Sequence, residues 1–257
     1  RTIKPQRVLD KADTASEALA LSIGEHACVD MPYMAELSGK TEEEIASELR
    51  GVIFRLPGSD DDNPQFVTAD EYLSGNVRKK LEQAQEATKV SPIFQDNVDA
   101  LLKAQPKDLE ASEIDVRLGA TWIDKNYIQE FMMELLQPPY YMSRILKVNY
   151  SPFTAEWNIT GKGNISMSDV NAYTTYGTVD INAYAILENT LNLRDVKIYD
   201  TVEDPDGKER RVLNAKKTTL AQQKQQIIKD AFREWIWKGP ERRQTLVKLY
   251  NEKFNAD

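Results

Sequence analysis

The spacing of apolar residues predicts helices as the main elements of the chain, with short β-strands between them. The stretch 14–27 carries apolar residues at fourfold spacing, at Leu19, Ile23 and Ala27, which indicates one buried face of a helix. Thr14 is followed three positions later by an acidic residue, which is the pattern of a capping box. The sequence therefore predicts a helix that begins just after Thr14.

The next elements follow the order of a winged helix. Capping residues, an early proline and glycine stops mark two short helices, and two short runs of β-forming residues flank a polar loop at 57–64. The order helix, turn, helix, strand, loop, strand is typical of this motif, and we predict it over residues 14–75. Its later elements are helices at 31–37 and 41–50 and strands at 52–55 and 65–68.

Beyond this region the pattern is first helical and then mixed. The helical part ends where Pro138 and Pro139 stop a helix that Asp124 caps. Tyrosines, β-forming residues and glycines then indicate strands, and a turn at 203–207 predicts a hairpin. The predicted elements are helices at 76–89, 92–104, 180–192, 217–237 and 240–254, besides the one from Asp124 to the proline stop, and strands at 145–150, 155–160, 196–202 and 210–213.

We therefore predict an α+β fold with three regions. Residues 1–75 form a winged-helix-like N-terminal region, and residues 76–140 form a helical middle. Residues 141–257 form an α+β region in which a small mixed β-sheet is flanked by basic C-terminal helices.

Composition limits the class of protein. The 257 residues are 41% hydrophobic and 29% charged, as in an ordinary globular protein, and the one cysteine, Cys28, cannot form an internal disulfide. No run approaches the roughly 18 apolar residues of a membrane span, and residues 1–5 lack the apolar core of a signal peptide. We expect a cytoplasmic chain without a membrane partner. Because it begins with Arg rather than Met, we expect a segment of a longer protein.

The sequence offers no candidate catalytic or metal-ligating residues. The run 38–41 resembles the end of a phosphate-binding loop, but that loop needs a glycine where Met34 stands. His26 is the only histidine, which excludes every His-dependent triad, and with Cys28 it supplies too few ligands for zinc. We therefore expect no catalytic residues, no metal and no cofactor in this segment.

Charge divides the chain into an acidic and a basic part. Residues 1–205 hold 20 basic and 34 acidic residues, whereas residues 206–257 hold 13 basic and 7 acidic ones. The helix of a winged helix that enters the major groove begins here with glutamates at 42–44, and its loop carries aspartates at 60–62. Phosphates would repel both, so we predict that this face contacts protein.

The basic part is the stronger candidate for contact with DNA. Lysine and arginine neutralise phosphates without reading sequence. A charged face packed beside a neighbouring domain is an equally open interpretation. The candidate DNA-binding residues are Lys208, Arg210, Arg211, Lys216, Lys217, Arg242 and Arg243, with a smaller cluster at Arg78, Lys79 and Lys80.

Five runs spread along the chain carry a family resemblance. They are Asp13–Leu19, Asp70–Arg78, Val116–Ile123, Ala172–Gly177 and Trp235–Trp237 with Pro240–Arg243. In this order they resemble the central region of large bacterial mobile-element proteins that fuse an adenine-specific DNA methyltransferase to a superfamily 2 (Snf-type) DNA helicase.

The resemblance implies a parent protein that acts on DNA with ATP, Mg and S-adenosylmethionine as its cofactors. It carries over no catalytic residue, because the family's motifs for both cofactors have no counterparts here. The leading hypothesis is thus a non-catalytic DNA-associated accessory domain that couples the neighbouring helicase and methyltransferase domains and contacts the DNA backbone without sequence specificity. The alternative is a protein-interaction scaffold between the two enzyme domains that has no DNA contact.

Overall fold

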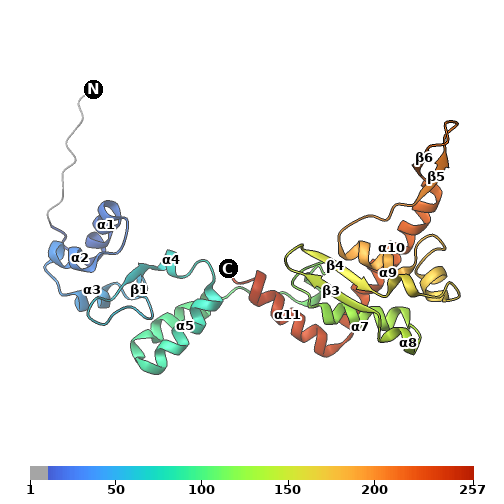
Figure 1. The fold of residues 1–257 in the computed structure, drawn as a ribbon. Coiled ribbons are helices and arrows are strands. Elements are labelled where there is room, and N and C mark those ends of the chain that lie inside the picture. The colour runs from blue at the N-terminus through green and yellow to red at the C-terminus, as the bar shows by residue number, and fades with distance from the viewer. Residues whose placement is uncertain (1–10) are drawn as a thin grey trace. The chain divides into compact units, whose positions relative to one another are not determined.

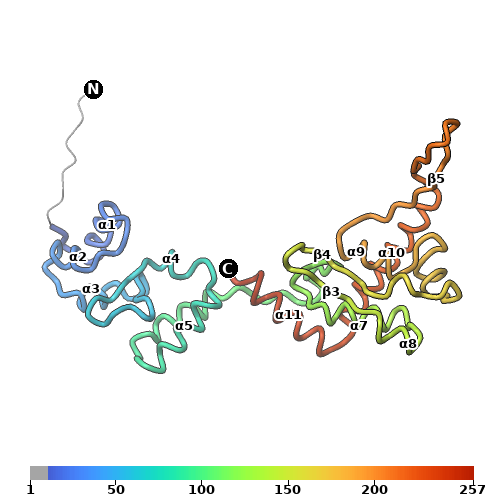
Figure 2. Tube along the Cα trace, viewed as in Figure 1, coloured from blue at the N-terminus to red at the C-terminus, as the bar shows by residue number. Residues whose placement is uncertain are grey.

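The computed structural model describes residues 11–257 and divides into two compact units (Figures 1 and 2). Unit 1 consists of the described residues up to Asp108 together with Asn251–Asp257, and unit 2 of Leu109–Tyr250. Both combine helices with short antiparallel strand pairs, so the predicted α+β class is confirmed. The three regions predicted from the sequence, with boundaries at 75 and 140, stay a prediction.

Unit 1 begins with the winged helix. Its first two helices end on the left-handed residues Ala27 and Gly39, and its two strands pair antiparallel on either side of the polar loop. Thr41 and Glu44 form the reciprocal bonds of a capping box at the start of α3. The elements are α1 (Ala15–His26), α2 (Met31–Ser38), α3 (Glu42–Glu48), β1 (Ile53–Arg55), β2 (Phe66–Thr68) and α4 (Ala69–Tyr72).

The buried face of α1 differs from the predicted one. The structure buries Ala15, Ala18 and Ser22, whereas Ile23 is 40% exposed. Small side chains allow α2 to pack closely against α1. Ser22 tolerates burial because its hydroxyl donates to the carbonyl of Cys28 at 2.7 Å and accepts from a backbone N–H at 2.9 Å.

The rest of unit 1 packs two helices, α5 (Val77–Val90) and α6 (Gln95–Ala104), against each other, with a 3₁₀ turn at Pro92–Phe94 between them. Residues 251–257 complete this unit. The backbone N–H of Val77 donates to the carbonyl of Ala256 at 3.0 Å, and Asn255 donates to the carbonyl of Lys107 at 2.8 Å. The start of α5 thus depends on residues from the far end of the sequence.

Unit 2 has its core between helices and one strand pair. Its irregular parts include 3₁₀ turns at Ala111–Glu113 and Lys162–Asn164 and a π-helical turn at Asn171–Thr175, which the sequence analysis did not foresee. The regular elements are α7 (Lys125–Leu136), α8 (Tyr140–Ser143), β3 (Lys147–Ser151), β4 (Glu156–Thr160), α9 (Ala183–Leu191), β5 (Tyr199–Glu203), β6 (Glu209–Leu213), α10 (Ala215–Lys238) and α11 (Pro240–Phe254).

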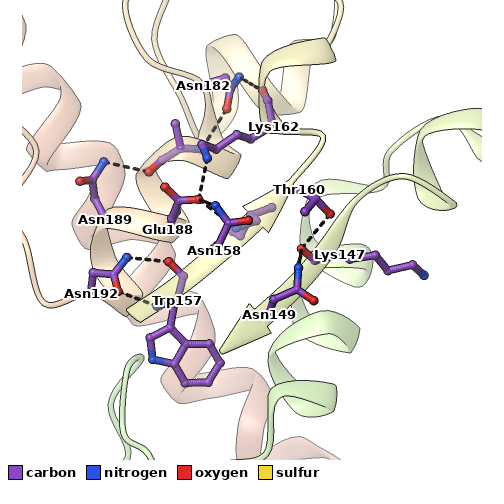
Figure 3. A network of polar contacts seen from close by, with 12 residues as sticks. Lys147, Asn149, Trp157, Asn158, Thr160, Lys162, Asn182, Glu188, Asn189 and Asn192 are labelled. Carbon is purple, nitrogen blue, oxygen red and sulfur yellow. Dashed lines mark hydrogen bonds and ion pairs between the residues drawn. The ribbon is translucent and has the colours of Figure 1, made fainter. Parts of the chain in front are cut away.

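Helix α9 supplies hydrogen bonds to the outer edge of β4 (Figure 3). The N–H of Trp157 donates to Asn192 Oδ1 at 2.8 Å, and Asn192 Nδ2 donates back to the Trp157 carbonyl at 2.9 Å. Glu188 accepts from the N–H of Ile159 at 2.8 Å and is paired with Lys162 Nζ at 2.8 Å. These backbone groups are the ones that a third strand would otherwise use.

Helix α7 does the same for β3. The N–H of Val148 donates to Gln129 Oε1 at 2.7 Å, and Gln129 Nε2 donates to the Leu146 carbonyl at 2.8 Å. Both edges of the β3–β4 pair are therefore bonded to side chains of the flanking helices.

The extended segment that leads from α9 into β5 is held by side chains of α10. Gln225 donates to the carbonyl of Arg194 at 2.8 Å and accepts from the N–H of Val196 at 3.2 Å. The hydroxyl of Thr218 accepts from the N–H of Ile198 at 2.9 Å. Since these backbone groups are bonded to a helix, β5 begins at Tyr199 rather than at the predicted residue 196.

The predicted small mixed sheet is replaced by two separate antiparallel pairs, β3–β4 and β5–β6. The physical reason lies in the edges. Side chains of α7 and the end of α9 bond to both edges of β3–β4, and side chains of α10 bond to the segment before β5, so a further strand could not pair at these places without displacing them.

Candidate nucleic-acid interface

The β5–β6 hairpin carries three of the predicted DNA-binding residues, Lys208, Arg210 and Arg211. Every residue of β6 is exposed, and the hairpin projects from the start of α10 (Figure 1). The register places Arg210 opposite Val202 and Arg211 opposite Thr201. Because consecutive side chains of a strand point to opposite faces, Lys208 and Arg210 lie on one face and Arg211 on the other. The three cations therefore do not form one patch.

Acidic residues offset the charge of this hairpin. Between Tyr199 and Leu213 the sequence holds five acidic and three basic residues. Arg210 is paired with Asp204 at 3.2 Å, and the guanidinium of Arg211 lies 4.5 Å from the ring centre of Tyr199. The hairpin alone thus has no excess of positive charge.

Lys216 and Lys217 lie in the first turn of α10, which Asn214 caps. Lys217 is 3.3 Å from Asp200 and 3.5 Å from Asp180, and the hydrogen bond with Asp200 raises the pKa of its ammonium group. The pKa of Asp200 is lowered, first by the hydrogen bond from Asn214 and then by the one from Lys217. Lys217 is thus occupied at the base of the hairpin, whereas Lys216 is exposed.

Arg242 and Arg243, near the start of α11, differ in their surroundings. The guanidinium of Arg242 lies 3.7 Å from the ring centre of Trp235, donates to that residue's carbonyl at 2.8 Å, and is 3.3 Å from Glu130. Its side chain is only 16% exposed, so it holds α11 against the core rather than facing a ligand. Arg243 stays exposed, with a long hydrogen bond of 3.4 Å to the Trp237 carbonyl.

The smaller cluster Arg78, Lys79 and Lys80 lies on α5, in unit 1. Arg78 is paired with Asp108 at 2.6 Å and donates to the carbonyl of Asn255 at 2.7 Å. Lys80 donates to the backbone carbonyl of Ser74 at 2.6 Å and to that of Glu71, in α4, at 3.1 Å. Two of these three cations therefore stabilise unit 1 itself, and Lys79 is the exposed one.

The positive charge of unit 2 is concentrated on α10. This helix holds six basic and two acidic residues. Lys229 and Arg233, which the sequence analysis did not single out, lie one turn apart and therefore on the same side of the helix. Their i, i+4 spacing was the signal that could have identified them.

The winged helix presents an acidic surface instead. The start of α3, the loop between β1 and β2, and α6 line a pocket of about 840 Å³ that includes Glu42, Glu43 and Asp62. Arg50 forms a two-pronged pair with Asp96 at 2.5 and 2.7 Å across it. Phosphate groups would meet mainly carboxylates on this face.

Two features that would indicate other classes of protein are missing from the described residues. Within residues 11–257, no three His, Cys, Asp or Glu side chains gather closely enough to hold a metal ion. No helix in this range combines the length and the apolar composition needed to cross a bilayer.

Two family matches agree with these elements. Residues 117–256 match the family described as Domain of unknown function (DUF8437), and residues 11–66 match the family described as Probable helicase, winged helix domain. No curated protein and no solved structure matches the chain. The second match runs from residue 11, just before α1, to Phe66 at the start of β2, so it confirms the predicted winged helix and supports an association with a helicase.

Proposed function

From the premise that this chain belongs to the family described as Domain of unknown function (DUF8437), and that a helicase winged helix precedes the domain, we propose a DNA-associated accessory function. The domain would contact the DNA backbone beside a helicase without reading the sequence and without catalysing a reaction. The winged helix would contact protein.

The charge of α10 is the observation that carries this proposal. Helix α10 holds six basic and two acidic residues, and such a helix attracts the phosphates of DNA whatever the base sequence. Among the predicted residues of unit 2, Lys208 and Lys216 are exposed and make no ion pair with another residue of the described part. Both are therefore available to a phosphate.

The wider setting of this function is also part of the proposal. The family resemblance in the sequence supports a bacterial mobile-element protein in which the domain couples a helicase to an adenine-specific methyltransferase. ATP with Mg and S-adenosylmethionine would be bound by those enzyme domains and not by this segment.

The test is binding of the whole chain to labelled single- and double-stranded DNA across a salt series. Backbone contact predicts an affinity that falls linearly on a log–log plot, with no preference for sequence. The variant Lys208→Gln/Lys216→Gln should reduce the slope on duplex DNA by about 0.9 for each phosphate that it no longer neutralises. Lys125→Gln/Lys147→Gln, which removes the same charge elsewhere on unit 2, is the control and should leave the slope unchanged.

A protein-interaction scaffold is the second candidate, and the acidic pocket of the winged helix favours it. If the chain binds no DNA even at low salt, the accessory function is wrong and the scaffold takes its place. The scaffold predicts that Glu43→Lys/Asp62→Lys, which reverses two charges of the pocket, weakens binding to the helicase partner in a pull-down with purified helicase. Glu110→Lys/Glu113→Lys, which reverses two exposed charges outside the pocket, should leave that binding unchanged.

A further inference from the structure

A small cavity in unit 2 collects basic side chains from three separate segments. Its volume is about 280 Å³, and its lining comes from residues 116–118, from the end of α9 and from α10. The charged residues that line it are Arg117, Arg194, Asp195, Lys229 and Arg233. None of the basic residues among them is one that the sequence pattern indicated.

The charges in this cavity are not balanced. Four cations face one carboxylate among the lining residues. Arg117 is paired with Asp115 at 2.8 Å and Arg194 with Glu156 at 3.1 Å, but all four partners are more than half exposed, and such pairs contribute little.

Lys229 and Arg233 are the two cations of the cavity that form no salt bridge among the described residues. The neighbouring carboxylate of Asp230, which accepts a hydrogen bond from Gln226 at 2.9 Å, is not among the residues that line the cavity. The cavity as a whole is therefore suited to an anion.

The end of α9 holds an apolar side chain beside these cations. The N–H of Leu193 donates to the carbonyl of Thr190 at 3.0 Å, and that of Arg194 to the carbonyl of Asn189 at 2.9 Å, which together form a Schellman motif. Leu193 occupies its left-handed position at φ 57°, where glycine is usual. The strained backbone keeps a side chain that is 78% exposed at the cavity.

The floor of the cavity is fixed by a buried amide. Gln225 is 3% exposed and bonds to the hydroxyl of Thr190 at 3.1 Å as well as to the segment after α9. The backbones of α10 and of the end of α9, which carry these cations, are thereby bonded to each other.

The size of the cavity limits the ligand. A volume of about 280 Å³ lies just below the roughly 300–1,000 Å³ of pockets that enclose drug-sized molecules. Planar guanidinium groups match the oxygens of a phosphate through two parallel hydrogen bonds. A phosphoryl group fits the cations, and an attached sugar or base fits Leu193.

We propose that this cavity binds a phosphoryl group of a nucleic-acid strand through Arg117, Arg194, Lys229 and Arg233, with Leu193 against the adjoining sugar or base. The inference rests on the proposed function, in that the phosphoryl group is one of the DNA that the domain contacts. It assigns this contact to the cavity rather than to the hairpin.

The test compares the whole chain with the variant Lys229→Gln/Arg233→Gln, whose folding is checked by its thermal unfolding temperature. The probes are an oligonucleotide with a 5′-phosphate, the same strand with a 5′-hydroxyl, and inorganic phosphate. We expect the variant to lose at least about tenfold in affinity for DNA, or about 1.4 kcal/mol. The charge-matched variant Lys208→Gln/Lys216→Gln should also bind DNA more weakly, but the change in the logarithm of its affinity should be less than half as large.

Each outcome separates the two proposals. Equal losses of DNA affinity in the two variants would mean that only overall charge matters. Unchanged DNA binding in Lys229→Gln/Arg233→Gln would exclude the cavity as the site. Neither outcome would contradict the accessory function. No DNA binding by the unaltered chain would overturn that function, and the cavity would survive only if inorganic phosphate still bound. A preference for the 5′-phosphate would identify a strand end as the source, and equal affinities an internal phosphodiester.

A second variant tests the strained residue. Asn tolerates the left-handed conformation better than Leu and removes the apolar contact. Leu193→Asn should therefore unfold at the same temperature or a higher one, yet bind DNA more weakly. Unchanged affinity would show that Leu193 is no part of the site.

Discussion

The two hairpins of unit 2 have the same length and topology but opposite environments. Each pairs two five-residue strands antiparallel. In β3–β4, alternate residues such as Trp157 and Ile159 are buried, and helices bond to both edges. In β5–β6, nearly all residues are exposed on both faces.

The difference shows what orders a two-stranded pair. An isolated hairpin is only marginally stable in water. The first pair is stabilised by its core contacts and by amide side chains, whereas the second depends on the contacts at its base, where Asp200 bonds to Asn214 and Lys217. We therefore expect substitutions to have unequal effects on the two pairs, and the pair with exposed edges to be the one free to contact other molecules.

The largest difference in stability between the two pairs should come from shortening an apolar side chain in each. Ile159→Ala removes a fully buried side chain from β4 and should cost about 2–5 kcal/mol in the free energy of unfolding. Val202→Ala in β5, where the side chain is 40% exposed, should cost less than about 1 kcal/mol. Urea unfolding followed by tryptophan fluorescence measures both, because all four tryptophans lie in unit 2. If the two substitutions lowered the free energy of unfolding equally, the two pairs would not differ in how their side chains stabilise them.

The edge bonds should come second. Asn192→Ala leaves the N–H and the carbonyl of Trp157 without partners and should cost about 1–3 kcal/mol. Asn192→Asp keeps the acceptor and loses the donor, so its cost should be smaller. Thr201→Ala on the exposed hairpin is the control, and the same urea titration measures all three. A neutral Asn192→Ala would mean that water replaces the side chain at this edge.

Replacing a buried tyrosine should have a smaller effect, and one that raises stability instead of lowering it. The hydroxyl of Tyr184, in α9, is buried and has no hydrogen-bond partner in the described structure, and burial raises its pKa. Tyr184→Phe should therefore raise stability by up to about 1 kcal/mol. A tyrosine whose pKa is raised in the folded state makes the protein less stable as pH rises from about 10 through the folded pKa. Phenylalanine has no group that ionises, so Tyr184→Phe should also resist alkaline unfolding. Tyr199→Phe, in exposed β5, should change neither quantity when both are measured by urea unfolding at neutral and alkaline pH.

The smallest effect is the acid sensitivity of β5–β6. The lowered pKa of Asp200 contributes stability above the unfolded value of 3.8, and this contribution is lost as pH falls through the folded pKa. The NMR amide shifts of residues 199–213 should therefore begin to move only below about pH 4. In Asp200→Asn this acid transition should be missing. A transition that persists in the variant would assign it to another carboxylate of the hairpin.

Much of the fold could be predicted because its signals are local. A cap acts on an N–H two or three residues away, so the sequence alone shows it. Thr14 and Asp124 both cap helices as predicted. Gln129, Asn192 and Gln225 could not be identified in this way, because an amide in or beside a helix looks solvent-exposed until its distant backbone partner is known.

The candidate site was predicted less well for the same reason. Residues close in sequence, such as Arg210 and Arg211, were grouped although strand alternation puts them on opposite faces. The cavity brings Arg117 together with Arg233, and only the fold shows that these two meet. A count of charges identifies the basic part of a chain, but not the place where its charges converge.

The division of unit 1 has a consequence for the order in which the protein is made. Val77 and Lys107 bond to Ala256 and Asn255, so these contacts cannot form until the ribosome has translated all of unit 2. Unit 2 is continuous in sequence and can fold during synthesis, whereas these bonds of unit 1 wait for residues 251–257. Their formation would then report that the whole of unit 2 has been made.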